Sequence, residues 1–378
     1  MSAETSSLEQ IWVASDQQLQ TICTQLQSAD ELAMDTEFIR TDTFYPRPAL
    51  LQISNGHLCY LVDVLALEQL EPLKKLLASG PLKVFHSCSE DLEMLKHWLG
   101  VLPQPLVDTQ LAAAFALKDP GKGYQRLVED LLGLQLEKGE TRSDWLQRPL
   151  TASQKKYAAQ DVEFLLPVWH QLKQRLKEQE WLTAVEQESQ WLVEEAQASG
   201  KDQPWLRLKQ AWQLSPEQLL VAQVLAKWRE EQAAKKDRPR NRIASDSLIH
   251  TLACVQPQQL HQLSQLEEAS PGWIRRYGDE VVALIAQTAQ QLPKHLPETR
   301  VSPISKEYKN LRKCLRQALA AYAAKLDLPQ EVLAKRKLQD SWLQDLLKGR
   351  QPELPERLPA WKKSALQDLV NQLEVTPA

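Results

Sequence analysis

The hydrophobic pattern of this chain changes from strand-like to helix-like part-way along, and this change limits the folds available to it. Short runs rich in β-forming residues lie at 31–38, 49–54, 58–64 and 82–87. Helical patterns separate and follow the later runs, so three adjacent strands and then alternating helix and strand predict an α/β domain. Its mixed sheet should have a hairpin-connected edge. Beyond about residue 200 the pattern is helical throughout, which predicts all-α domains there.

A chain of 378 residues is too long for one ordinary hydrophobic core, and its length favours two or three domains. The stretch ASGKDQP (198–204) combines Gly, Pro and charge and is the main predicted boundary. Behind it, an internal repeat occurs at an offset of 90 residues, which suggests two copies of one helical domain. The repeat matches Ala233, Ala234, Lys235, Asp237 and Pro239 with Ala323, Ala324, Lys325, Asp327 and Pro329. We therefore predict domains at 1–200, 205–292 and 298–378.

Composition indicates a folded protein without a membrane anchor or a disulfide framework. Hydrophobic residues make up 43% of the chain and charged residues 25%, as in globular proteins. The five cysteines are an odd number, lie far apart and form no CxxC pair, so neither disulfides nor a zinc site is predicted. The sequence has no signal-peptide pattern and no apolar run long enough to span a bilayer. We expect a cytoplasmic protein with no membrane partner.

Two basic runs occur in a chain whose formal net charge is −4. Residues 227–242 hold seven Lys or Arg residues against three acids, and residues 300–316 hold six against one. Such patches favour contacts with phosphate groups, although solvated helix faces have the same pattern. Five cations of the first run are the predicted RNA contacts: Lys235, Lys236, Arg238, Arg240 and Arg242.

Two acidic residues interrupt the apolar strand at 31–38. Asp35 and Glu37 are two positions apart, so a strand places both side chains on one face. Clustered carboxylates on an apolar strand are costly unless a cation compensates their charge, and Mg²⁺ or Mn²⁺ prefers oxygen ligands. The pair thus indicates a divalent-metal site, although a surface or edge strand can carry the same pattern.

A second acidic motif lies on a predicted helix. Tyr157 and Asp161 are four residues apart and share one helix face, and Thr151 with Gln154 forms a capping-box pattern that sets the start of this helix. Asp91 lies near the start of the helix after the last predicted strand, where the helix dipole favours a carboxylate. Each residue also has a purely structural interpretation, at a helix edge or as an N-terminal charge. Their combination points to a catalytic site.

The combined motifs resemble the DEDD exonucleases, which have a DnaQ-like, ribonuclease H-like fold. The four carboxylates match in order and the YxxxD spacing is similar to the tyrosine branch: Asp35, Glu37, Asp91, Tyr157 and Asp161. The other branch has histidine where this chain has Lys156. The resemblance covers roughly residues 10–195. It implies a ribonuclease H-like mixed sheet flanked by helices, and 3′ to 5′ exonuclease activity with two divalent ions, Mg²⁺ or Mn²⁺.

Within that superfamily the chain resembles the ribonuclease D family. The similarity lies in the segments SEDLEML (89–95), TRSDWLQRPL (141–150) and YAAQDV (157–162). The helical repeats resemble the HRDC domain, a small module shared with RecQ-type helicases. The second copy departs from the first, with Leu326 and Leu328 where the first has Lys236 and Arg238, so the nucleic-acid contacts are assigned to the first copy.

The resemblance also implies roles for the matched residues. Asp35 would bridge both metal ions, and Glu37 and Asp161 would complete the site that holds the attacking water. Asp91 would help to hold the second ion. Tyr157 would orient the water by hydrogen bonding, since an unperturbed tyrosine pKa of about 10 makes it a poor base at neutral pH. Substrates would be tRNA precursors and other structured RNA 3′ ends, and products nucleoside 5′-monophosphates.

Other residues have two interpretations. Arg142 is predicted to contact phosphate, and Trp145 either stacks on a base or packs in the core. His86 and Phe38 are further substrate contacts or structural residues. Two other functions remain open, a DNA 3′-5′ exonuclease and a catalytically silent RNA-binding protein. We expect a monomer without an obligate protein partner, because the chain has no heptad seam.

Overall fold

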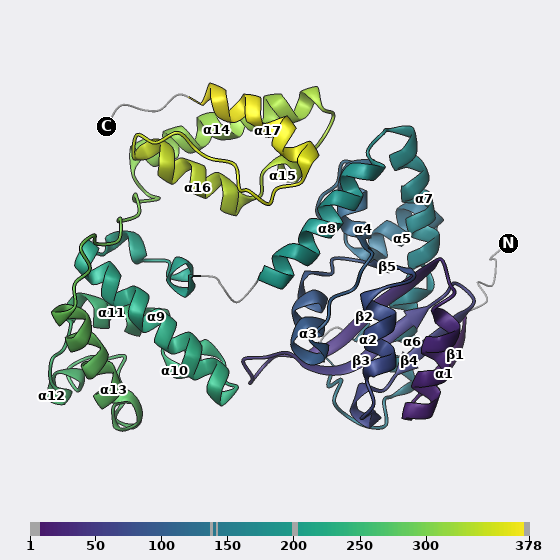
Figure 1. Cartoon of the computed structure of the whole chain (residues 1–378), viewed down its shortest axis with the longest axis horizontal. Coiled ribbons are helices and arrows are strands. Elements are labelled where there is room, and N and C mark those ends of the chain that lie inside the picture. The colour runs from purple at the N-terminus through teal and green to yellow at the C-terminus, as the bar shows by residue number, and fades with distance from the viewer. Residues whose placement is uncertain (1–7, 137–138, 141–142, 199–202, 374–378) are drawn as a thin grey trace.

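The computed structural model describes residues 8–136, 139–140, 143–198 and 203–373 of the chain. An N-terminal α/β domain is followed by two separate groups of helices, which lie beside it at different places (Figure 1). The predicted fold class, an α/β domain followed by all-α domains, is therefore confirmed. Of the helices in the described ranges, none has both the length and the apolar composition needed to cross a membrane.

One six-stranded mixed sheet forms the centre of the α/β domain, in the order β1-β4-β3-β2-β5-β6. The strands are β1 (Glu9–Val13), β2 (Glu31–Ile39), β3 (Arg47–Ser54), β4 (Leu58–Val62), β5 (Leu82–Phe85) and β6 (Leu106–Asp108). The β2-β3-β4 meander is antiparallel, and the other three pairings are parallel. The prediction of a hairpin-connected edge is wrong, because the unpredicted strand β1 pairs with β4 and covers that edge. The run EQIWV is too short and too polar at its start to indicate a strand.

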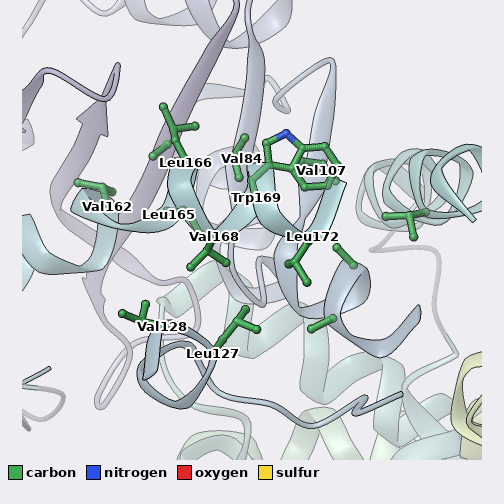
Figure 2. Close-up of a cluster of buried hydrophobic side chains, with 14 of the residues drawn as sticks. Val84, Val107, Leu127, Val128, Val162, Leu165, Leu166, Val168, Trp169 and Leu172 are labelled. Carbon is green, nitrogen blue, oxygen red and sulfur yellow. The ribbon is translucent and has the colours of Figure 1, made fainter. Parts of the chain in front are cut away.

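Helices cover both faces of this sheet. One face packs against α1 (Asp16–Leu26), α2 (Glu71–Ala78) and α3 (Ser89–Leu99). The other packs against α4 (Thr109–Ala116), α5 (Tyr124–Leu132), α6 (Ala152–Glu163) and α7 (Leu165–Glu178). Figure 2 shows this second core, in which Val84 and Val107 of the sheet meet Trp169 and Leu172 of α7. Helix α8 (Leu182–Ala198) runs beside β6 and contacts α3.

The capping box at the start of α6 is present as predicted, with Thr151 and Gln154 each accepting the other's backbone N–H. The helix ends at Glu163, and α7 begins at Leu165. Pro167 explains the break, since it has no N–H and its ring clashes with the carbonyl four residues earlier, that of Glu163. Helix α6 is therefore short, and its position is fixed separately from that of α7.

Helix α3 begins without a side-chain cap. Ser89 is its first helical residue, and Cys88 is in the capping position without a side-chain capping hydrogen bond. The Asp108 carboxylate, at the end of β6, accepts the backbone N–H groups of Ser87 and Cys88 instead. Gly100 ends the helix in the left-handed conformation. The helix that carries Asp91 is thus anchored to a neighbouring strand.

The helical part contains two similar arrangements. The first consists of α9 (Pro216–Lys236), α10 (Arg240–Ile243), α11 (Asp246–Val255), α12 (Leu260–Leu263) and α13 (Pro271–Gln290). The second consists of α14 (Lys306–Lys325), α15 (Gln330–Leu333), α16 (Arg336–Leu347) and α17 (Ala360–Gln372). Helices α14, α15 and α16 begin at 306, 330 and 336, and α9, α10 and α11 begin at 216, 240 and 246, an offset of 90 residues each time. Each arrangement has its own hydrophobic core.

The second helical arrangement packs directly on the α/β domain. Leu326 and Leu328 contact the core cluster that lies under α4 and α7, and the neighbouring Asp327 pairs with Lys118 at 3.2 Å. These leucines replace two cations of the first copy, so the departure from the repeat has a packing reason. This corner therefore lacks two of the cations that were predicted to contact phosphate in the first copy.

A buried ion pair joins the same two parts of the molecule. Lys362 Nζ of α17 donates to Glu188 Oε2 of α8 at 2.7 Å, and Trp361 Nε1 donates to Glu188 Oε1 at 3.0 Å. Both charged residues are 2% exposed. Burial raises the pKa of Glu188 and lowers that of Lys362, and each partner's charge opposes this effect. The pair therefore depends on both members being present.

We predict that Lys362→Met lowers the free energy of unfolding by about 3–5 kcal/mol, because it leaves the Glu188 carboxylate buried without its cation. Urea unfolding followed by tryptophan fluorescence measures this change. The double variant Glu188→Gln/Lys362→Met should recover most of the loss, since it removes both charges. A single variant as stable as the unchanged protein would show that the pair does not hold the domains together.

Candidate active site

Three acidic side chains converge on one face of the central sheet. Asp35 and Glu37 lie two positions apart on β2, so both leave the strand toward α6. Helix α6 packs across β2, β3 and β4 and carries Asp161. One carboxylate oxygen from each of the three residues lies within 4.8 Å of the others. The structure thus brings together the residues that the sequence motifs place on a strand and on a distant helix.

Asp91 lies in the first turn of α3 and is buried. Its Oδ1 accepts a hydrogen bond from the hydroxyl of Thr36, the residue between the two acids of β2. This bond ties the start of α3 to the strand that carries Asp35 and Glu37. The Asp91 charge also raises the pKa values of both of those residues. All four predicted carboxylates therefore belong to one electrostatic cluster.

The cluster is strained by its own charge. Burial, together with repulsion from Asp161 and Asp91, raises the pKa of Glu37 to about 9. Burial likewise raises the pKa of Asp161 to about 7 and that of Asp91 to about 6. Asp35 has a pKa well above its usual range, because it is buried and faces all three other carboxylates. A cation bound between these groups would restore their ionised forms.

Tyr157 lies one helical turn before Asp161 and hydrogen-bonds to its carboxylate. Burial and the nearby carboxylates raise the pKa of the phenol above its ordinary value, so the group stays protonated at neutral pH. Gly139 lies against the aromatic ring so closely that a Cβ atom there would overlap it. Tyr157 is therefore a positioned hydrogen-bond donor at the rim of the carboxylate cluster.

The ligand chemistry of this cluster fits divalent ions that prefer oxygen. Asp35, Glu37 and Asp161 supply at least three convergent carboxylate oxygens, and Mg²⁺ and Mn²⁺ bind through such groups together with water. The unfavourable charge that the cluster carries by itself is what such an ion would relieve. The residues present thus fit a divalent-metal centre.

Comparisons with known proteins agree with this geometry. A family model described as 3′-5′ exonuclease matches residues 10–177, and one described as HRDC domain matches residues 218–285. Ribonuclease D of Pseudomonas paraeruginosa is 37% identical over 369 residues, covering 96% of this chain and 97% of that protein. Ribonuclease D of Escherichia coli is 32% identical, covering 96% and 97%. The chain belongs to the ribonuclease D family.

A solved structure supports the same assignment. The crystal structure of E. coli ribonuclease D, described as an exoribonuclease involved in structured RNA processing, matches with a TM-score of 0.87 and 31% identity. The match covers 96% of this chain and 98% of that one. As a member of the ribonuclease D family, the chain is a metal-dependent 3′-5′ exoribonuclease, and the resemblance stated from its motifs is confirmed.

Arg142 and Trp145 were the two residues of the α/β domain predicted to line the RNA path. Arg142 lies outside the described residues. Trp145 is 2% exposed, with its ring 6.0 Å from that of Tyr157. An indole buried in this way is not exposed to stack on a base, so its burial favours the packing interpretation. The hydrophobic core under α6 takes up the side chain because it is large and apolar.

In the basic loop of the first HRDC domain, four cationic side chains are exposed and one is held in an ion pair. Lys235, Lys236, Arg238 and Arg242 are exposed, although Lys236 also contacts the Tyr277 hydroxyl at 3.0 Å. Arg240 forms a two-bond ion pair with Glu230 and lies 4.5 Å from the centre of the Phe44 ring. Arg240 is therefore part of the contact between domains, and the other four cations face solvent.

Sequence reasoning missed the residue that completes this contact. Asp237 ends α9 in the left-handed conformation, with φ of 45°, and its Oδ1 accepts the backbone N–H groups of Phe44 and Tyr45 at 3.0 Å each. These two residues belong to the loop between β2 and β3. The first HRDC domain thus holds the loop that leads directly out of the strand with Asp35 and Glu37. The internal repeat includes Asp237, but no sequence pattern indicates that it contacts the β2–β3 loop.

His86 and Phe38 have structural contacts in this arrangement. His86 Nδ1 lies 2.9 Å from the hydroxyl of Thr109, whose own hydrogen bond goes to the carbonyl of Phe85. Phe38 is partly buried against the core on the opposite face of the sheet. Asp63 and Asp108 cap the helical segments that follow them.

We predict that Asp35→Asn stabilises the metal-depleted protein. Because the carboxyl pKa values in the folded state exceed their ordinary values of 3.8 and 4.5, folding takes up protons. The free energy of unfolding then falls as pH rises from about 4 toward about 9. At pH 8 with EDTA the variant should raise Tm by about 3 °C or more, given roughly 2–4 °C per kcal/mol. The gain should shrink at pH 5.

Asp42→Asn is the matched control, because Asp42 is an exposed carboxylate shortly after the same strand. It should leave Tm unchanged at both pH values. Differential scanning calorimetry without and with Mn²⁺ measures all three proteins. A lower Tm for Asp35→Asn at pH 8 would contradict the repulsion that the geometry implies.

Proposed function

We propose that this ribonuclease D trims structured RNA, tRNA precursors among them, from the 3′ end and releases nucleoside 5′-monophosphates. The observation that carries the proposal is the convergence of Asp35, Glu37 and Asp161 beside the phenol of Tyr157. E. coli ribonuclease D, described as acting in structured RNA processing, supports the substrate class. We further propose a cytoplasmic monomer, in keeping with the sequence.

We propose that the cluster holds two divalent ions, Mg²⁺ or Mn²⁺. When bound, such ions activate a water for in-line attack and stabilise the leaving oxygen of a phosphodiester. Asp35, whose charge interacts with those of the other three carboxylates, would contribute to both ions. Glu37 and Asp161 would hold the ion on the side of α6, and Asp91 would support the other from the start of α3.

Tyr157 would position the attacking water. Its hydroxyl already donates to the Asp161 carboxylate, so it stands at the edge of the metal cluster. Because its pKa is raised, the phenol would act by donating or accepting a hydrogen bond and not by removing a proton. Trp145 and Gly139, which pack against the ring, would keep its orientation fixed.

The exposed cations of the first HRDC domain would supply sequence-independent contacts with RNA phosphates. We assign this role to Lys235, Lys236, Arg238 and Arg242. Arg240 would act indirectly, since its ion pair with Glu230 and its contact with Phe44 occupy the guanidinium. Arg142 remains a proposed phosphate contact from the sequence.

The first test is degradation of a 5′-labelled, 3′-tailed tRNA-like RNA with Mg²⁺ or Mn²⁺, beside EDTA and Asp35→Asn controls. We expect a ladder that shortens from the 3′ end and disappears in both controls, because both remove the metal site. A matched DNA strand is run in parallel. Faster shortening of DNA would favour a DNA exonuclease, and RNA binding without shortening would favour a catalytically silent RNA-binding protein.

The second test concerns RNA binding. Lys235→Glu/Arg238→Glu/Arg242→Glu should weaken binding of a long RNA at least tenfold and flatten the salt dependence, because fewer counterions are released. Hydrolysis of a very short RNA should be unchanged. The control Lys75→Glu/Arg175→Glu/Lys177→Glu alters three exposed cations elsewhere and shifts the net charge equally. Equal effects of the two triple variants would contradict a specific role for the basic loop.

A further inference from the structure

Gln52 of β3 is a buried polar side chain that the proposed mechanism does not use. It is 0% exposed, and neither Nε2 nor Oε1 has a hydrogen-bond partner among the residues that the structure describes. Gln154, also buried, shows the usual situation: its Oε1 accepts the Thr151 N–H and its Nε2 donates to the Asp144 carbonyl. Gln52 therefore stands out as a fully desolvated amide without compensation.

The strand register places this amide beside the metal cluster. Gln52 pairs with Asp35 across the antiparallel β2–β3 ladder, and with Leu61 on its other side across β3–β4. Directly paired residues of antiparallel strands point to the same face, with Cβ atoms about 4.5–5.5 Å apart. Leu61 is apolar, so Asp35 is the polar group that the pairing brings next to Gln52. Helix α6 packs over all three strands here.

A buried amide without hydrogen-bond partners lowers the stability of the fold by its full desolvation free energy. A hydrophobic side chain of similar shape at the same position has no such penalty. Such groups in folded proteins are usually satisfied in the state in which the protein works, or serve its chemistry. The amide N–H₂ of Gln52 is a donor, and an ionised Asp35 is an acceptor of charge-assisted hydrogen bonds. The two groups are chemically complementary.

We propose that Gln52 is a positioning residue for the metal centre. Within the described part of the chain, Gln52 Nε2 has no partner; with a divalent ion bound, it would donate to one Asp35 oxygen while the other Asp35 oxygen holds the ion. The hydrogen bond fixes the orientation of the carboxylate and favours its ionised, metal-binding form. Gln52 lies beneath α6 and does not touch RNA, so it acts through Asp35. The inference rests on the proposed metal site.

The test compares Mn²⁺ binding to the full chain with and without the amide. Gln52→Met keeps the size of the side chain and removes its polar atoms. The control Lys83→Met makes the same kind of change at a buried cation on β5 that donates to the carbonyls of Ser79 and Gln104. Lys83 pairs with Leu32 and lies on the opposite face of the sheet from Asp35. Isothermal titration calorimetry gives the Kd for Mn²⁺, and calorimetric scans give Tm with EDTA and with Mn²⁺.

We expect Gln52→Met to raise the Kd for Mn²⁺ about 10- to 100-fold, the usual effect of losing a partner of a metal ligand. Its Tm in EDTA should equal or exceed that of the unchanged protein, because an unpaired amide is lost. Lys83→Met should lower Tm in EDTA and leave the Kd for Mn²⁺ unchanged. If Gln52 has a purely structural role, Gln52→Met should behave like Lys83→Met, with a lower Tm in EDTA and an unchanged Kd for Mn²⁺.

The outcomes separate this inference from the proposed function. Absence of Mn²⁺ binding by the unchanged protein would overturn the metal site itself. Normal binding by both the unchanged protein and Gln52→Met would overturn only the role of Gln52. If Gln52→Met does not fold, a crystal structure of the unchanged protein with Mn²⁺ decides. A distance of about 3.2 Å or less from Gln52 Nε2 to an Asp35 oxygen supports the proposal, and any longer separation contradicts it.

Discussion

Repulsion between carboxylates that the fold forces together is the constraint on which the rest of this structure depends. Asp35 and Glu37 share a strand face and α6 brings Asp161 onto them. Burial raises the pKa values of all three groups, and repulsion between carboxylates adds to this effect for Asp35 and Glu37. The scaffold must hold them against that repulsion. The capping box at Thr151, the Thr36 hydroxyl on Asp91 and the anchoring of α3 by Asp108 each fix one contributing element. A bound cation offsets the repulsion between the carboxylates, so the same arrangement favours cation binding.

The helical domains contribute to the same rigidity from outside. The first holds the β2–β3 loop through Asp237, and the second is tied to α8 by the buried pair of Glu188 and Lys362. Helix α8 in turn packs on β6 and α3. The RNA-binding module and the catalytic strands are therefore joined by direct contacts, in addition to the chain that connects them.

Much of the site could be predicted from the sequence because its signals are local. Asp35 with Glu37, and Tyr157 with Asp161, are pairs whose spacing fixes a shared face, and the repeat offset of 90 residues reappears in the helix starts. The features that could not be predicted depend on contacts with residues distant in the sequence. Strand β1 is defined by its pairing with β4, and Trp145 is buried by helices that surround it. The contacts of Arg240 depend on how the first HRDC domain docks, and the place of Gln52 beside Asp35 depends on strand register; no local pattern predicts either.

The two similar helical arrangements, α9–α13 and α14–α17, use the same corner differently. In the first copy the corner after the long helix exposes Lys236 and Arg238, and in the second the equivalent Leu326 and Leu328 are packed against the α/β domain. Asp237 and Asp327 have kept the same left-handed backbone but contact different partners, two amides in one case and Lys118 in the other. The same structural module thus presents exposed cations in one copy and an apolar contact surface in the other. Two side-chain positions, one on each side of the aspartate, distinguish these two surfaces.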